Sequence, residues 1–310
     1  MMRRCLITYE NISEQEKYSK KGLKSLSPQL KDLEPLEFSA LEQRQEAIAR
    51  VGKMSIQGVQ PKLSAQLKVK ENRFDLVDSG GHYILKPPSE YYPELPENEA
   101  ITMTLAALID IEVPVHGLVY AKDQSLTYFI KRFDRKGHTK KVALEDFAQL
   151  SEFTRDTKYN SSMEKVAKVV TRFCTFPKIE AAKLFKLTLF NFLIGNEDMH
   201  LKNFSLITRD QKITLSPAYD LLNTTIAQTN TKEELALPLN GKKSNLKKED
   251  LVEYFALQFL QLNQTIVSEI FKEIQQALPE WESLIKRSFM SAMMQEKYLL
   301  LLEDRIKRVL

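Results

Sequence analysis

The sequence contains little cysteine, and nothing near its two thiols suggests a bound metal. Cys5 and Cys174 are the only cysteines, and no cluster of histidines or further cysteines surrounds them. A disulfide scaffold needs several paired cysteines, and a structural zinc site needs about four clustered ligands. The composition therefore argues against both scaffolds and is typical of a reducing compartment.

The sequence also lacks any run of about 18 apolar residues, the length that a membrane-spanning helix requires. The N-terminal stretch MMRRCLITYENISEQEKYSKK turns polar before it reaches the apolar length of a secretory signal peptide. We therefore expect a cytoplasmic protein with no membrane segment.

Neither sign of charge dominates. The 310 residues contain 45 Lys and Arg against 41 Asp and Glu, a net charge of +4, and 43% of the residues are hydrophobic. This balance excludes broad electrostatic capture of nucleic acid, and we find no helix-turn-helix pattern, so no direct DNA binding is expected. The length and apolar content are sufficient for two lobes.

The pattern of apolar residues changes along the chain and predicts an α+β protein with a β-rich N-lobe and a mostly helical C-lobe. Residues 1–50 form a weakly periodic lead segment. Residues 51–135 contain short alternating runs such as HYILK and LTYFIKRF around one helical stretch, ENEAITMTLAALI. Residues 136–310 contain helical runs, EDFAQL among them, and a run ending at Gly195 as at a C-terminal cap. Within this lobe, FSLIT and KITLS predict a hairpin.

The segment GNEDMHLKNF places Asp198 and Asn203 five positions apart, directly after a helix. Protein kinases use this spacing in their catalytic loop, where the Asp accepts or orients the substrate hydroxyl and the Asn binds magnesium. A polar turn, in which the Asp caps a helix and the Asn is left-handed, is the alternative. Asp220, just beyond a predicted strand in ITLSPAYDLL, supports the kinase interpretation because kinases hold a second metal-binding acid there.

Two further features are consistent with phosphate binding. Lys86 ends the run HYILK as the phosphate-binding lysine of kinases ends its strand, and Glu99 of the next helix could pair with it. A strand-end lysine is commonly only a solvated charge, and a first-turn glutamate commonly serves the helix dipole. Gly58 could let the backbone from Gln57 to Val59, with Gln60 and Lys62, surround phosphates, although an ordinary strand turn fits equally well.

Six segments occur in an order that resembles the HipA family of serine/threonine kinases, the toxins of bacterial toxin–antitoxin systems: SIQGVQPK, HYILKPP, IKRFDR, GNEDMHLKNFS, LSPAYDLL and LNGKKSNL. The resemblance spans about four fifths of the chain, from Ser55 to the C-terminal helices. It implies a two-lobed kinase fold with ATP and Mg²⁺ as cofactors. It also implies a protein substrate in translation, an aminoacyl-tRNA synthetase.

The resemblance assigns roles residue by residue. Asp198 would be the catalytic base, Asn203 and Asp220 would hold magnesium, and Ser55 would be autophosphorylated, which expels the loop and silences the enzyme. The residues that would contact ATP are Gln57, Gly58, Val59, Gln60, Pro61 and Lys62 in the phosphate loop, the phosphate-binding Lys86, the hinge residues Lys131, Arg132 and Phe133, and His200, Asn203, Tyr219 and Asp220.

Two departures from the family pattern affect the expected partners. The lead before Ser55 is shorter than the β-rich subdomain of full-length family toxins, so the chain resembles the short HipT form, in which a separate small protein matches the missing piece. We expect that small protein and a DNA-binding antitoxin as partners. Gln57 stands where some short forms have a second serine, so a two-serine switch is not assumed.

Two rival functions remain at this level. A small-molecule kinase of the aminoglycoside or lipid kinase type shares the same Asp, Asn and Asp chemistry. A nucleotide-binding repressor subunit is the non-enzymatic rival, and the complete set of Lys86, Asp198, Asn203 and Asp220 argues against it.

Overall fold

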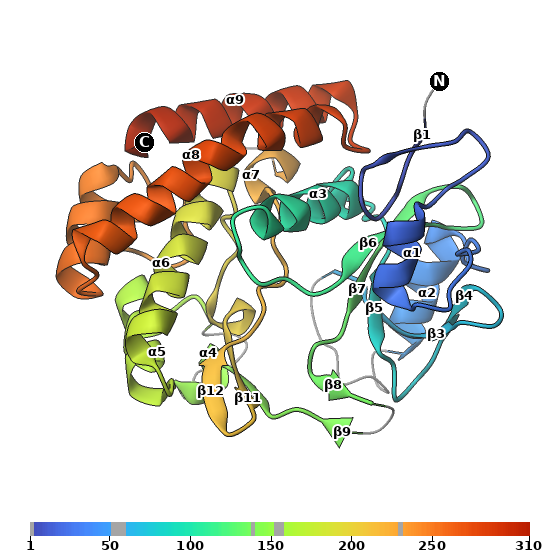
Figure 1. Ribbon diagram of the computed structural model, residues 1–310, viewed down its shortest axis with the longest axis horizontal. Coiled ribbons are helices and arrows are strands. Elements are labelled where there is room, and N and C mark those ends of the chain that lie inside the picture. The colour runs from blue at the N-terminus through green and yellow to red at the C-terminus, as the bar shows by residue number, and fades with distance from the viewer. Residues whose placement is uncertain (1–2, 51–59, 138–139, 152–157, 229–231) are drawn as a thin grey trace. The chain divides into compact units, whose positions relative to one another are not determined.

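The structure, a computed structural model, describes residues 3–50, 60–137, 140–151, 158–228 and 232–310 (Figure 1). The chain divides into two compact units, each built from segments that are separate in sequence. The first unit contains Met1–Ile101, Pro114–Lys140 and Arg287–Met290; the second contains Thr102–Val113, Lys141–Lys286 and Ser291–Leu310.

An antiparallel sheet forms the centre of the first unit. Its strands are β3 (Leu63–Lys68), β4 (Arg73–Leu76), β5 (Tyr83–Lys86), β6 (His116–Tyr120) and β7 (Leu126–Lys131), in the order β4-β3-β5-β7-β6. Leu63, Leu85 and Phe129 are fully buried in this unit. The register places Lys86, the last residue of β5, opposite Tyr128 of β7. The strand β5 is therefore paired on both sides, with β3 and with β7.

The segment 1–50, described above as a lead, contributes to the core of the same unit. It contains β1 (Arg3–Arg4), β2 (Asn11–Ile12), α1 (Lys20–Leu26) and α2 (Ala40–Arg50). Cys5, Tyr9 and Leu33 are each at most 1% exposed. The first unit also contains β8 (Arg135–Lys136), whose partner β9 (Lys140–Lys141) begins in this unit and ends in the second.

One helix, α3 (Leu95–Ala107), is shared between the units, with its residues through Ile101 in the first. It confirms the helix expected around Ile101 and Leu105, both of which are fully buried. Within the second unit, the Trp281 indole nitrogen donates to the Leu105 carbonyl at 3.0 Å. The first turns of α3 carry Glu99.

The second unit is mostly helical, as predicted. Its helices are α4 (Phe147–Leu150), α5 (Met163–Phe173), α6 (Pro177–Ile194), α7 (Thr224–Ala227), α8 (Gln264–Lys286) and α9 (Ala292–Val309), with a 3₁₀ helix η1 (Leu201–Asn203) and a π-helix η2 (Glu249–Phe259). The apolar helix α6 is buried along most of its length and contacts α5 and α9, and Figure 1 shows α8 and α9 side by side. None of the helices in the described part of the chain is long and apolar enough to cross a membrane.

The predicted hairpin is present as β11 (Ser205–Arg209) and β12 (Lys212–Leu215). Asp210 and Gln211 at its turn have φ angles of +48° and +63°, which matches the right-handed twist of a two-residue hairpin. The helix predicted over EDFAQL was too long. Its first residues belong to β10 (Leu144–Asp146), which pairs with β11. The Asp146 side chain then caps the short helix α4 by accepting a hydrogen bond from the backbone N–H of Gln149.

Candidate active site

The candidate catalytic loop begins where α6 ends, at Gly195. This residue has φ +71°, and its N–H is bonded to the last turn of the helix, so the predicted glycine cap is confirmed. An added Cβ at this position would collide with the Leu301 side chain and lie 2.8 Å from Thr225 Oγ1. Both the backbone angle and the space therefore require glycine before the loop.

Replacing Gly195 with alanine is expected to destabilise the second unit by about 2–4 kcal/mol, the combined cost of a left-handed alanine and a steric clash. Gly241→Ala is the matched control, because Gly241 has φ +74° but nothing lies within 4 Å of an added Cβ. Urea unfolding should show a loss of about 1 kcal/mol for the control. Equal losses for the two variants would mean that the clash at Gly195 is relieved without cost.

Buried amides hold the loop around Asp198. The Asn196 side chain is fully buried, donates to Asn191 Oδ1 at 2.9 Å and accepts from the Asp198 N–H at 3.2 Å. The Asn203 amide donates to the Asp198 carbonyl at 2.9 Å. The backbone of Asp198 is thus fixed on both sides, while its carboxylate is half-buried.

The amide bond from Asn203 has a chemical consequence. Because Nδ2 is the donating atom, Oδ1 is the atom of this side chain that could face a cation. The residue is buried, at the end of η1. Its orientation therefore fits the metal-ligand role that the sequence suggests.

Asp220 lies in a left-handed backbone conformation, with φ +54°. Aspartate tolerates this left-handed conformation better than most residues. Such backbone conformations are common at functional sites, where they orient a side chain. The preceding residue, Tyr219, donates its hydroxyl to the Lys202 carbonyl at 2.9 Å and lies 2.6 Å from Ser205 Oγ. Burial raises the pKa of this phenol, so it remains a donor that connects the Asp220 segment to the catalytic loop.

The oxygen set of Asn203 and Asp220 fits Mg²⁺, which prefers hard oxygen ligands and usually keeps one or two protein ligands beside phosphates and water. Among the described residues, no group of three or more His, Cys, Asp or Glu side chains could hold a metal ion. Asn203 and Asp220 are residues that could hold Mg²⁺ beside a nucleotide.

His200 interacts electrostatically with both Asp198 and Asp220. Burial lowers its pKa, and Lys158 lowers it further, although Asp198 and Asp220 both act in the opposite direction. Its Nδ1 accepts from the Lys202 N–H at 3.2 Å, and its Nε2 lies 2.7 Å from Lys158 Nζ. The imidazole is therefore neutral near pH 7 and serves to position the loop.

A residue that the sequence analysis missed contacts the candidate base. The Tyr159 hydroxyl donates a short hydrogen bond to Asp198 Oδ1. Its ring meets the His200 ring edge-on at 5.1 Å, and Lys158 Nζ lies 4.9 Å from the ring centre. Burial and the Asp198 carboxylate raise the pKa of this phenol, so it stays protonated. No spacing signal connects residues 159 and 198 in the sequence.

In the first unit, Lys86 and Glu99 form the expected ion pair. Lys86 Nζ lies 2.5 Å from Glu99 Oε1, and the side chains are 3% and 1% exposed. Lys86 Nζ also lies 5.5 Å from the centre of the Tyr128 ring. A lysine buried to this degree is not a solvated strand-end charge, so that alternative is wrong.

The predicted phosphate loop is described only in part. Ser55, Gln57, Gly58 and Val59 lie outside the described residues. Gln60, Pro61 and Lys62 are half-buried, and the buried Gln60 Nε2 has no hydrogen-bond partner among the described residues. A buried donor without a partner is costly unless a ligand meets it, so Gln60 fits a position that faces an anion.

The predicted hinge, Lys131 to Phe133, begins with the last residue of β7. The N–H of Lys131 donates to the Val115 carbonyl at 2.8 Å, and the N–H of Arg132 donates to the His82 carbonyl at 2.7 Å. The Arg132 guanidinium is bidentate on Asp134. These two amides are engaged within the first unit, so an adenine would have to use other groups of the segment.

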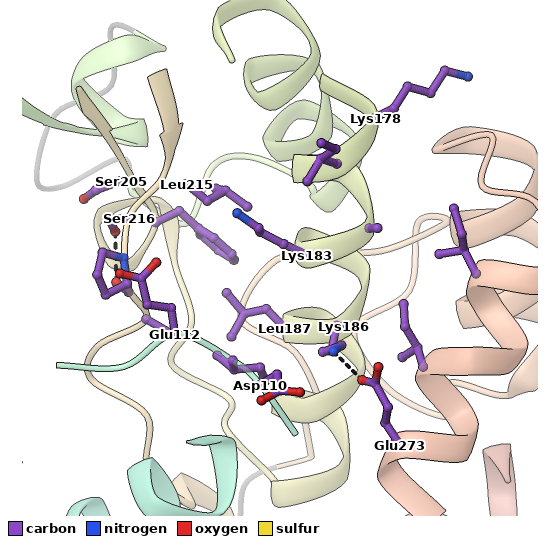
Figure 2. Close-up of a pocket in the computed structure, with 18 of the residues that line it drawn as sticks. Asp110, Glu112, Lys178, Lys183, Lys186, Leu187, Ser205, Leu215, Ser216 and Glu273 are labelled. Atoms are coloured by element: carbon purple, nitrogen blue, oxygen red, sulfur yellow. Dashed lines mark hydrogen bonds and ion pairs between the residues drawn. The ribbon is translucent and has the colours of Figure 1, made fainter. Parts of the chain in front are cut away.

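Two cavities of the second unit border the catalytic loop. One, of about 400 Å³, is lined by Asp198, Tyr159, Glu197, Glu233, Lys232 and Lys243. The other, of about 450 Å³, is lined by Asn203 and by residues of α6, and Figure 2 shows Leu187 of α6 on one side of it and Leu215 of β12 and Ser216 on the other. An ion pair between Lys186 and Glu273 lies at its edge. The cavity that contains the carboxylate of Asp198 is the candidate phospho-acceptor site.

The chain is similar to known kinases. A family model described as HipA-like C-terminal domain matches residues 54–281. A candidate kinase of Haemophilus influenzae is 31% identical over 264 residues, which cover 76% of this chain and 76% of that protein. The candidate kinase Y4dM of Sinorhizobium fredii is 33% identical over 258 residues, which cover 77% of this chain but 62% of the relative. The serine/threonine-protein kinase toxin HipA of Shewanella oneidensis is 26% identical over 61% of this chain and 47% of its own length.

Solved structures show the same fold. HipA in the Shewanella oneidensis complex of HipA, HipB and operator DNA superposes with a TM-score of 0.70 at 21% identity, over 90% of this chain and 73% of that one. The Helicobacter pylori proinflammatory kinase CtkA superposes with a TM-score of 0.59 at 16% identity, over 84% and 91%. The fold is thus kinase-like, and because the family model also covers most of its residues, this chain belongs to the HipA family of kinases.

Proposed function

We propose that the protein is an ATP- and Mg²⁺-dependent serine/threonine protein kinase and the toxin of a toxin–antitoxin system. Its substrate in this proposal is a translation component, an aminoacyl-tRNA synthetase. The observation that carries the proposal is the bond between the Asn203 amide and the Asp198 carbonyl, which joins a candidate metal ligand to a candidate base in one short loop.

The residues divide the chemistry among themselves. Asp198 accepts the proton of the substrate hydroxyl. The hydrogen bonds of its backbone to Asn196 and Asn203 keep the carboxylate in position. Lys86, oriented by Glu99, contacts the nucleotide phosphates. Asn203 and Asp220 hold Mg²⁺, which when bound neutralises phosphate charge. In the proposal, Tyr219 and His200 border the nucleotide, and Gln57 to Lys62 face its phosphates.

Transfer of label from [γ-³²P]ATP to a lysate tests the proposal directly. Purified protein with Mg²⁺ should label a discrete protein band, which mass spectrometry then identifies. Label found only in small molecules would replace the proposal with the small-molecule kinase function. No label beyond background in either fraction would reject kinase activity.

Asp220→Asn is expected to weaken Mg·ATP binding by at least tenfold. The change removes a charged oxygen ligand from a hard cation, and changes to outer-shell groups alone cost about 10–100-fold in metal affinity. Calorimetry with and without Mg²⁺ provides the check. The variant and the wild type should bind ATP equally in the absence of Mg²⁺, and an unchanged affinity for Mg·ATP would refute the role.

Ser55 is the proposed self-inactivation site. A phosphate on Ser55 adds about −1.5 to −2 charges, which the nucleotide phosphates would repel and so drive the loop outward. Mass spectrometry should find phosphate on the peptide containing Ser55 after incubation with Mg·ATP. Ser55→Ala should lose that phosphate and still phosphorylate substrate. An active wild type that never carries phosphate on Ser55 would leave the residue a simple turn serine.

Two protein partners complete the proposal. One is a separate small protein that matches the β-rich N-terminal subdomain of full-length family toxins. The other is a DNA-binding antitoxin that would carry operator contact, as HipB accompanies HipA and DNA in the Shewanella complex. Co-expression of the neighbouring genes followed by affinity purification should recover both proteins. Elution of this chain alone would reject the split-toxin arrangement.

A further inference from the structure

A tyrosine hydroxyl already occupies the position on Asp198 that a phospho-acceptor requires. Tyr159 donates to Asp198 Oδ1, its ring meets the His200 ring edge-on at 5.1 Å, and the Lys158 ammonium group, itself beside His200, lies 4.9 Å from the ring centre. The side chain is nevertheless 39% exposed, because it lines the cavity of about 400 Å³ beside the base. The phenol is therefore fixed at its oxygen and still open to that cavity.

The contact has the geometry of the first step of phosphoryl transfer. A general base must lie within hydrogen-bond reach of the proton that it removes, and in kinases the group bonded to this aspartate is the nucleophile. We propose that Tyr159 is an autophosphorylation site, modified in cis by the chain's own Asp198. This inference rests on the proposed kinase function.

The step balances without any further reactant. A lone pair of Tyr159 Oη forms the new bond to the γ-phosphorus of ATP, and the bond from that phosphorus to the β–γ bridging oxygen breaks. ADP leaves with the electron pair of that bond, and the phenolic proton passes to Asp198 Oδ1. The products are phosphotyrosine, ADP and one proton that Asp198 returns to water.

The same cavity can accommodate the product. A phosphotyrosine carries about −1.5 to −2 charges, so the Asp198 carboxylate would repel it. Lys232 and Lys243 line the cavity, and Lys243 pairs with Glu233 at 3.2 Å in the unmodified protein. These ammonium groups can bind the phosphate at a position away from Asp198. Lys243 would then exchange its ion pair with Glu233 for one with the phosphate.

Peptide mapping of the full-length protein tests the inference. The protein is first treated with phosphatase and then incubated with Mg·ATP, and the tryptic peptide YNSSMEK, residues 159–165, is sequenced by fragmentation. Phosphate is expected on Tyr159, and not on Ser161, which is buried, or Ser162, which caps α5. Asp198→Asn should slow this labelling by about 10²–10⁴-fold.

Two variants sharpen the assignment. Tyr159→Phe should remove phosphate from the peptide. Tyr254→Phe is the matched control, because Tyr254 also bonds a carboxylate in the second unit, that of Glu164, and its removal should leave the labelling unchanged. Asp198→Asn protein mixed with active wild type should stay unlabelled at residue 159, since the transfer is in cis.

The outcomes separate this inference from the kinase function. Wild type that turns over ATP or phosphorylates another residue while Tyr159 stays unmodified would overturn the inference and leave the function standing. Phosphate on Ser161 or Ser162 in place of Tyr159, or label on the inactive chain, would also overturn it. Absence of any phosphoryl transfer would overturn both.

Discussion

Replacing Asp198 with asparagine is expected to lower the rate of phosphoryl transfer by about 10²–10⁴-fold, the usual contribution of a positioned general base. Asparagine has the same shape, and the backbone of residue 198 keeps its bonds to Asn196 and Asn203. An amide, however, cannot accept the hydroxyl proton. Initial rates of label transfer to protein, at saturating Mg·ATP, give the measurement.

The control is Asp210→Asn, the same chemical change at an exposed residue of the β11–β12 turn. Asparagine tolerates the positive φ of that turn, so activity and unfolding should match the wild type. A folded Asp198→Asn protein that transfers phosphate at the wild-type rate would show that Asp198 is not the base.

Breaking the buried pair of Lys86 and Glu99 is expected to cost stability and activity together. Lys86→Met or Glu99→Leu alone should lower the free energy of unfolding by about 3–5 kcal/mol, because each change leaves an unpaired charge in a buried site. The double variant should recover most of this loss, since two apolar side chains can replace a buried ion pair at little cost. Kinase activity should remain absent in both variants that lack Lys86, because the phosphate contact is gone.

This combination separates a structural role from a catalytic one. If activity returned with stability in the double variant, Lys86 would be only a structural partner of Glu99. The exposed pair of Lys307 and Glu303 provides the comparison, with side chains 70% and 60% exposed. Lys307→Met should change the unfolding free energy by less than about 1 kcal/mol, as is usual for surface pairs.

Features encoded by local chemistry could be predicted from the sequence. The apolar spacing of α6 and the glycine after it predicted where the helix ends, because a left-handed cap at that point favours glycine. The hairpin β11–β12 followed from two alternating runs around a polar turn. Lys86 and Glu99 were paired through the order of a strand and a helix, and the structure confirms the contact.

Features that depend on distant segments were not predicted. The strand β10 was taken for the start of a helix, since three residues acquire extended structure only by pairing with β11, some 60 residues later. Residues 287–290 belong to the first unit although helices of the second flank them. Pairing and packing across such separations leave no periodic signal in the chain.

The sequence by itself determined the local elements and the family motifs, because spacing, turn chemistry and residue type act over a few neighbouring positions. Only the tertiary structure decided which side chain meets the carboxylate of Asp198. Tyr159 comes from a segment 39 residues away, and the contact exists because the folded second unit packs the phenol against His200 and Lys158. A hydrogen bond between distant residues depends on packing, which residue order alone does not specify.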